Sequence, residues 1–113
     1  MDIRTVVADD EEPARNELCF LLEPLDEVDV IGQAADGIEA LRLIKTLKPD
    51  LVLLDIQMPG LTGFEVAREL LVLEIDAKVV FVTAYDEYAI EAFNVNAVDY
   101  LLKPVEPKRL MQT

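Results

Sequence analysis

The sequence contains no histidine, no tryptophan and no serine, and it has a single cysteine, Cys19. Without histidine, neither imidazole catalysis nor a histidine metal ligand is possible, and one thiol cannot form an internal disulfide or a cysteine metal cluster. Because Cys19 lies between Leu18 and Phe20, we expect it to be a small core residue rather than a reactive thiol. Any chemistry in this chain must therefore use oxygen and amine groups.

Long hydrophobic runs and basic residues are also scarce. No apolar run approaches the length of a membrane span, and the N-terminus has no signal-peptide pattern, so we expect a cytoplasmic protein. Only 10 basic residues stand against 23 acidic ones, which gives a net charge of −13. A domain this acidic is unsuited to direct binding of nucleic acid or of an anionic membrane. At 113 residues, the chain is expected to form one domain.

Short apolar runs of the kind that form buried strands alternate with helical patterns along the chain. The run Leu51–Leu54 is the clearest, because Asp55 and then the turn-forming Met58-Pro59-Gly60 follow it. The other predicted strands are Ile3 to Ala8, Val28 to Ala34, Lys78 to Thr83 and Ala97 to Leu102. The last of these keeps Asp99 and Tyr100, which suits an edge strand.

The predicted helices follow the strands in turn. Pro13 suits the first turn of a helix that continues to about Glu23, and Lys48-Pro49 closes the next one. Two capping boxes, Asp36 to Glu39 and Thr62 to Glu65, predict where the second and third helices begin. A short fourth helix is expected from Asp86 to about Phe93, and a fifth is expected from Pro107, with the chain ending inside it.

This alternation predicts an α/β fold, a doubly wound parallel sheet covered by helices on both faces. Right-handed crossovers restrict the topology. Three strands are the most continuously apolar and should therefore be central in the sheet: Ile3–Ala8, Leu51–Leu54 and Lys78–Thr83. The flavodoxin-like (βα)5 order 2-1-3-4-5 fits this best.

Polar residues follow four of the predicted strands at their carboxyl ends. They are Asp9 and Asp10, Asp55, Thr83, and Lys103. In a parallel sheet all these ends share one edge, so three carboxylates should converge there. Their mutual repulsion is relieved when a hard cation lies between them. With no thiol cluster or imidazole available, Mg²⁺ or Mn²⁺ is the natural candidate. Each aspartate taken alone could equally be a helix cap or a turn former.

The set of motifs resembles the receiver domain of two-component response regulators over the whole chain. The resemblance rests on Asp9-Asp10, on Asp55 to Gly60, on Thr83-Ala84 and on Tyr100 to Pro104. Further stretches, Ala8 to Arg15 and Val82 to Asp86 followed by Val95 to Tyr100, resemble the subgroup fused to a LytTR-type (LytR/AlgR) DNA-binding domain. That output domain is not within residues 1–113.

The resemblance implies a role for each matching residue. Asp55 is expected to be the phosphoacceptor for a sensor histidine kinase, in a signalling domain rather than an enzyme. Asp10, Asp55 and the main-chain carbonyl of Gln57 would bind Mg²⁺, with Asp9 acting directly or through water.

Three further positions complete the implied site and its output. Lys103 and Thr83 would contact the phosphoryl group, and Lys103-Pro104 would be a cis peptide. Tyr100 would act with Thr83 as the switch, and an amphipathic edge-strand tyrosine is an equally good reading of this residue. Homodimerisation through helix 4, strand 5 and helix 5 is the expected response, with Tyr88, Ala92, Phe93 and Val95 as contact residues and both signs of charge around them: Asp86, Glu87, Glu91, Asp99, Lys108 and Arg109.

Other functions fit the sequence less well. A haloacid-dehalogenase-type phosphatase also uses an aspartyl nucleophile and Mg²⁺, but it needs a second aspartate two positions later, and Asp9 and Asp10 are adjacent. A flavin carrier needs a phosphate-binding loop where this chain has Asp9 to Glu12, which repels phosphate. A receiver used only for interaction would lack one of the polar groups, and none is missing.

Overall fold

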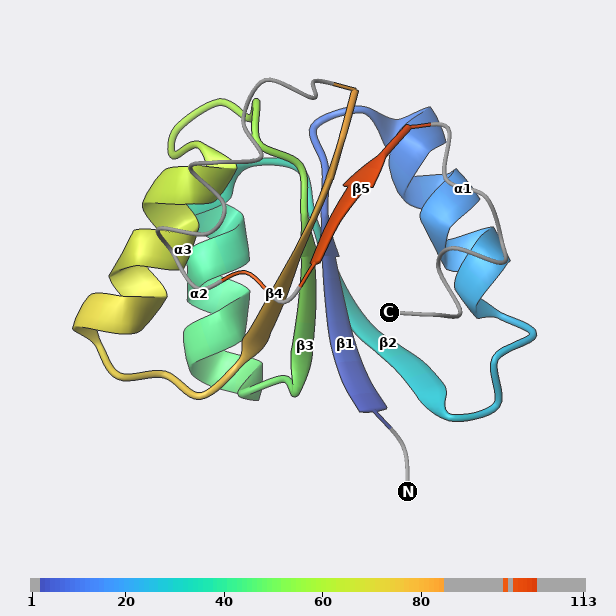
Figure 1. Cartoon of the computed structure of the whole chain (residues 1–113), viewed down its shortest axis with the longest axis horizontal. Helices are drawn as coiled ribbons and strands as arrows, with labels where there is room; N and C mark the ends of the chain where they lie inside the picture. Colours follow the sequence, from blue (N-terminus) through green and yellow to red (C-terminus); the bar gives the residue numbers. More distant parts are fainter. Residues whose placement is uncertain (1–2, 85–96, 98, 104–113) are drawn as a thin grey trace.

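Five parallel strands form one sheet, in the order β2-β1-β3-β4-β5. The computed structural model describes residues 3–84, 97 and 99–103, and Figure 1 shows the sheet between its helices. This is the predicted order, with β1, β3 and β4 in the centre. The fold class and the switch point between β1 and β3 are therefore confirmed.

The element boundaries lie close to those predicted. The strands are β1 Ile3–Ala8, β2 Val28–Ala34, β3 Leu51–Leu54, β4 Lys78–Thr83 and β5 Asp99–Leu102. The helices among the described residues are α1 Glu12–Leu22, α2 Gly37–Leu47 and α3 Gly63–Val72. The fifth strand begins two residues later than predicted, because its first pair with β4 is Asp99 with Val80. Ala97 lies outside the strand.

The sheet is covered on both faces. Helix α1 lies on one side, and α2 and α3 lie together on the other (Figure 1). One core cluster joins α2 and α3 to the sheet, with Phe64 and Phe81 packed edge to face at 5.0 Å between ring centroids. The second joins α1 to the sheet through Leu18 and Leu22. Cys19 packs at the margin of this second cluster and is half-buried.

The helix starts bear out the cap predictions to different extents. At α3 the full capping box is present: the Thr62 hydroxyl accepts from the Glu65 N–H, and the Glu65 carboxylate accepts from the Thr62 N–H. At α2 the structure gives one half of the predicted box, in which the Asp36 carboxylate accepts from the Glu39 N–H at 2.7 Å. Both arrangements satisfy helix N–H groups that have no partner within the helix.

The strands end close together at their carboxyl edge. Ala8 pairs with Leu54 at the ends of β1 and β3, and Thr83 pairs with Leu102 at the ends of β4 and β5. Because Leu54 pairs with Phe81, β4 extends two residues beyond β3. The residues that follow β1, β3 and β5 are Asp9, Asp55 and Lys103. The register therefore delivers the polar groups predicted from the sequence to the same edge of the sheet.

Some predictions fall on parts of the chain that are not described. The helices expected from Asp86 and from Pro107 lie outside the described residues. The same is true of the predicted dimer contact residues Tyr88, Ala92, Phe93 and Val95, and of Pro104 in the predicted cis peptide. Within the described part, no helix is long and apolar enough to span a membrane.

Candidate functional site

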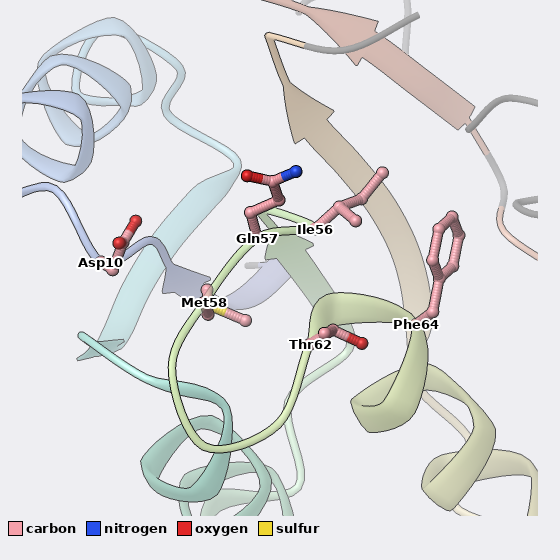
Figure 2. Close-up of a pocket in the computed structure, with 6 residues that line it drawn as sticks. All are labelled: Asp10, Ile56, Gln57, Met58, Thr62 and Phe64. Carbon is pink, nitrogen blue, oxygen red and sulfur yellow. The ribbon is translucent and has the colours of Figure 1, made fainter. Parts of the chain in front are cut away.

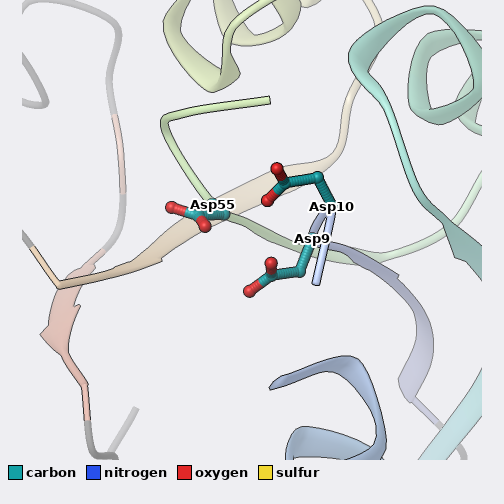
Figure 3. Close-up of side chains that lie close together, drawn as sticks. All are labelled: Asp9, Asp10 and Asp55. Atoms are coloured by element: carbon teal, nitrogen blue, oxygen red, sulfur yellow. The ribbon is translucent and has the colours of Figure 1, made fainter. Parts of the chain in front are cut away.

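Three aspartates meet at the carboxyl edge of the sheet. Asp9, Asp10 and Asp55 each place a carboxylate oxygen within 4.8 Å of the others, and Figure 3 shows the three side chains close together. Asp9 is fully buried, Asp55 is 7% exposed and Asp10 is exposed. The cluster therefore has a closed side at Asp9 and an open side at Asp10.

Asp9 is held by hydrogen bonds on every polar atom. Its N–H donates to Ala34 in β2 at 3.0 Å, and its carbonyl accepts from the Arg15 guanidinium at 2.8 Å. One carboxylate oxygen accepts from the Glu11 N–H at 2.9 Å, and the other accepts from Lys103 Nζ at 2.6 Å. A charge this deeply buried requires such partners. Arg15 was not among the predicted site residues, although its place near the start of a helix beside the acidic run was a usable signal.

Asp55 is the central group of the site. Its N–H donates to Ala8 at 2.9 Å, and one carboxylate oxygen accepts from the Ile56 N–H at 2.7 Å. The other oxygen lies 3.2 Å from Lys103 Nζ. Burial raises the pKa of the Asp55 carboxyl above its usual range, the Lys103 charge opposes this, and the Asp9 charge adds to it.

Lys103 bridges the two buried carboxylates from the end of β5. Its N–H donates to the Thr83 carbonyl at 2.8 Å, which ties it to the end of β4. Burial disfavours the ammonium, but hydrogen bonds and charge from Asp9 and Asp55 outweigh it, so the pKa of Lys103 is raised. The lysine is therefore a fixed positive charge in this site at neutral pH.

The remaining predicted site residues lie around this cluster. Thr83 is fully buried at the end of β4. Tyr100 is half-buried on β5, with its ring 6.4 Å from that of Phe81. Gln57 is exposed, two residues after Asp55.

A surface hollow of about 520 Å³ adjoins the open side of the cluster. Asp10, Gln57 and Thr62 supply its polar rim, and Ile56, Met58 and Phe64 supply apolar wall (Figure 2). No sequence pattern indicated this hollow, because it forms only where the loop after β3 curves back to α3.

The donor set fits a hard divalent cation. Carboxylate oxygens are the ligands that Mg²⁺ prefers, and the ion typically keeps several waters. Asp10 faces solvent, so it leaves room for those waters, while Lys103 offsets part of the charge on the buried pair. The cluster can therefore hold such an ion next to the Asp55 carboxylate.

Comparison with known proteins agrees with this geometry. The profile of the response regulator receiver domain matches residues 5–113. The chain belongs to the response-regulator receiver family. It is a signalling domain of two-component systems rather than a classical enzyme, as predicted, and the named relatives give no support to the dehalogenase-type alternative.

The relatives of this receiver domain are response regulators of bacteria. It is similar to a response regulatory protein of Vibrio vulnificus, with 54% identity over 113 residues, and to the sensory transduction protein LytT of Bacillus anthracis, with 46% identity over 111 residues. Each match covers 98% of this chain, and the relatives are covered to 46% and 45%. The chain thus spans about half the length of these relatives.

The solved structures agree on the fold. The signal receiver domain of the response regulator NarL from Mycobacterium tuberculosis is similar with a TM-score of 0.92 and 36% identity, over 98% of this chain and 91% of that one. The response regulatory domain of mrkE from Klebsiella pneumoniae gives 0.89 and 32%, over 96% and 89%.

Proposed function

We propose that Asp55 is the phosphoacceptor of this receiver domain and takes its phosphoryl group from a phosphohistidine of a sensor kinase. A carboxylate oxygen of Asp55 attacks phosphorus, the N–P bond breaks, and its electron pair remains on the departing imidazole. Aspartate is an established covalent nucleophile. The observation that carries the proposal is the position of Asp55 between two other carboxylates and Lys103 at the carboxyl edge of the sheet.

The proposed metal ligands are Asp10, Asp55 and the main-chain carbonyl of Gln57, with Asp9 acting directly or through a water. Mg²⁺, or Mn²⁺, would when bound neutralise charge on the transferred group, whose transition state is loose and depends mainly on positioning and electrostatics. The oxygen donor set and the solvent-facing Asp10 support this choice of ion.

Lys103 and Thr83 are the proposed partners of the phosphoryl group once it is on Asp55. The Lys103 ammonium already contacts Asp55 and needs only a small shift to reach a phosphoryl oxygen. The Thr83 hydroxyl and the Ala84 N–H follow β4 at the same edge and would donate to the other oxygens. A cis Lys103-Pro104 peptide would help aim the lysine inward.

The proposed output is a change at Thr83 and Tyr100 that promotes pairing of two receiver domains through helix 4, β5 and helix 5. In the full-length protein the paired domains would control a DNA-binding output domain in the cytoplasm. The receiver itself, with a net charge of −13, would not touch DNA. A transcriptional output is supported by the relatives LytT and BtsR, the latter a transcriptional regulatory protein of Salmonella typhi. BtsR is 45% identical to this chain over 111 residues, which cover 98% of this chain and 46% of BtsR.

Intact-mass measurement tests the chemistry directly. Acetyl phosphate with Mg²⁺ should add one phosphoryl group to the protein, and Asp55→Asn or a chelator should prevent the addition. Asp29→Asn, which removes an equal charge from the exposed face of β2, is the control and should be phosphorylated like the parent. A phosphoryl group that mapped to a threonine would contradict the proposal, and the absence of serine and histidine simplifies the mapping.

A further inference from the structure

The first residue of α3 lies directly against the backbone of Asp55. The N–H of Gly63 donates to the Ile56 carbonyl at 2.8 Å. A Cβ atom at position 63 would lie 2.3 Å from the Asp55 carbonyl oxygen and 3.0 Å from Ile56 Cα. Both neighbours are backbone atoms, so no side chain can move aside to make room. Only glycine fits here without displacing the peptide that follows Asp55.

That peptide also determines where the Asp55 carboxylate points. Its N–H, from Ile56, donates to the carboxylate at 2.7 Å, while the Asp55 N–H is held by Ala8 at 2.9 Å. A displacement of the peptide therefore shifts the carboxylate relative to Lys103. The same displacement moves Gln57, which follows directly in the chain.

The helix side of the contact is rigid as well. The reciprocal bonds between Thr62 and Glu65 fix the first turn of α3, and the Phe64 side chain is 5% exposed in the core. A second glycine fastens the outer part of the same loop: the Gly37 N–H donates to Pro59 at 3.1 Å, and a Cβ there would lie 1.9 Å from the Leu61 carbonyl oxygen. The loop from Gln57 to Thr62 is thus held at both ends by close backbone contacts.

We infer that Gly63 is a positioning residue for phosphoryl transfer: its contact with the Asp55–Ile56 peptide sets the place of the phosphoacceptor carboxylate and of the Gln57 carbonyl relative to Asp10. This inference rests on the proposed function and adds a residue that touches neither metal nor phosphoryl group. Groups that orient metal ligands without touching the metal commonly change metal affinity or activity by about 10- to 100-fold when they are replaced.

A glycine needed only for folding would give a different result. Both roles predict that Gly63→Ala lowers the stability of the domain. Only the positioning role predicts that the folded variant has a displaced site, seen as weaker Mg²⁺ binding and slower phosphorylation under conditions where the protein is fully folded. The matched control is Gly32→Ala in β2, where the added Cβ would meet side-chain methyl groups rather than backbone: Leu47 at 3.2 Å, Leu43 at 3.4 Å and Val6 at 3.8 Å.

The experiment compares the parent, Gly63→Ala and Gly32→Ala. Mg²⁺ affinity is measured by calorimetry, phosphorylation by acetyl phosphate is followed by intact mass, and urea unfolding confirms that each variant is folded. Gly63→Ala should weaken Mg²⁺ binding and slow phosphorylation by at least about tenfold, and Gly32→Ala should stay within about twofold of the parent. In a chelator, the amide NMR signals of Asp55 and Ile56 should shift in Gly63→Ala and not in Gly32→Ala, which reports the displacement without metal or activity.

A second variant decides the matter if Gly63→Ala does not fold. Thr62→Ala removes the hydroxyl that accepts from Glu65 and so loosens the helix side of the contact without a clash. It should weaken Mg²⁺ binding by a factor of about 3 or more, less than a direct displacement. Thr46→Ala, which removes a hydroxyl bonded to Arg42 near the end of α2, is its control and should bind as the parent does.

The outcomes separate the two proposals. A parent protein that neither binds Mg²⁺ nor gains a phosphoryl group contradicts the proposed function. The positioning role alone is overturned by a different result. In that result the parent binds Mg²⁺ and is phosphorylated, and a folded Gly63→Ala or Thr62→Ala variant binds Mg²⁺ and is phosphorylated equally well, with the Ile56 amide signal unchanged.

Discussion

Lys103 Nζ lies 2.6 Å from the carboxylate of Asp9, closer than its 3.2 Å approach to Asp55. The Asp9 side chain is 1% exposed and the lysine side chain 22%. The lysine therefore does two things at once: it neutralises a buried acidic pair, and it repels any cation that approaches the same oxygens.

Replacement of this lysine should separate those two effects. Lys103→Met leaves two buried carboxylates without their partner, and we expect a loss of roughly 3 kcal/mol in the free energy of unfolding in chelator. Mg²⁺ binding should become tighter, because the lost repulsion is about 1 kcal/mol or more, a factor of about five in affinity. Urea unfolding and calorimetry measure the two quantities.

The matched control for this variant is Lys45→Met, which removes an equal charge from the exposed surface of α2. It should change neither property appreciably. Weaker Mg²⁺ binding in a folded Lys103→Met protein would mean that the lysine organises the carboxylates rather than competing with the ion.

Asp10 is the exposed member of the acidic cluster, so its removal tests the metal site with little effect on the core. Asp10→Asn should weaken Mg²⁺ binding by at least about tenfold, since loss of a group that only orients a metal ligand commonly lowers the metal affinity by that factor. Asp29→Asn controls for the change in net charge. If Asp10→Asn bound Mg²⁺ like the parent in a calorimetric titration, the ion would not lie in this cluster.

The raised pKa of Asp55 makes a prediction about pH. Burial and the nearby Asp9 charge hold this pKa above its ordinary value of 3.8. The native state then binds the proton more tightly than the unfolded chain, so the Asp55 contribution to stability is lost as pH rises through the native pKa. In chelator at pH 7, Asp55→Asn should therefore be more stable than the parent.

The gain should shrink as the pH falls through the native pKa of Asp55, and it should stop changing below the ordinary value of 3.8, where the carboxyl is protonated in both states. Urea unfolding of both proteins across this range checks the sign. A variant less stable than the parent at neutral pH would show that the Lys103 pairing outweighs the cost of burial.

Dimerisation is the proposed output that can be tested without a kinase. Beryllofluoride with Mg²⁺ mimics the phosphorylated aspartate, and linkage requires that the mimic and dimerisation favour each other equally. Sedimentation equilibrium should show an association constant raised by a factor of about 5 or more, and Thr83→Ala should reduce this factor while Thr46→Ala should not. Equal association constants with and without the mimic would remove dimerisation as the output.

The sequence predicted the strands well because β1, β3 and β4 are short, mostly apolar runs with a polar residue at the carboxyl end. Ile3–Ala8, Val28–Ala34 and Lys78–Thr83 match the observed bounds, and the convergence of Asp9, Asp55 and Lys103 follows from parallel topology alone. The sequence could not show which of the two adjacent aspartates, Asp9 or Asp10, is buried. Asp9 is buried and the adjacent Asp10 is exposed, and this difference depends on Lys103 and Arg15, which come from other elements.

Close backbone approaches were hidden for a similar reason. Gly37 and Gly63 are recognisable in the sequence only as residues that follow a helix cap. Their contacts with Leu61 and Asp55 arise from how the loop after β3 returns to the sheet. Local patterns locate where a helix begins, and the distance from that helix to Asp55 is a tertiary property.

The hydrogen bond between Asp9 and Lys103 joins residues 94 positions apart. A contact of such long range forms late, after the intervening strands have paired, because the loop it closes is entropically costly until other contacts shorten it. A chain still emerging from the ribosome, or one partly unfolded, therefore lacks the ammonium that completes the site. We therefore expect the proposed phosphoacceptor site to be complete only in the fully folded domain.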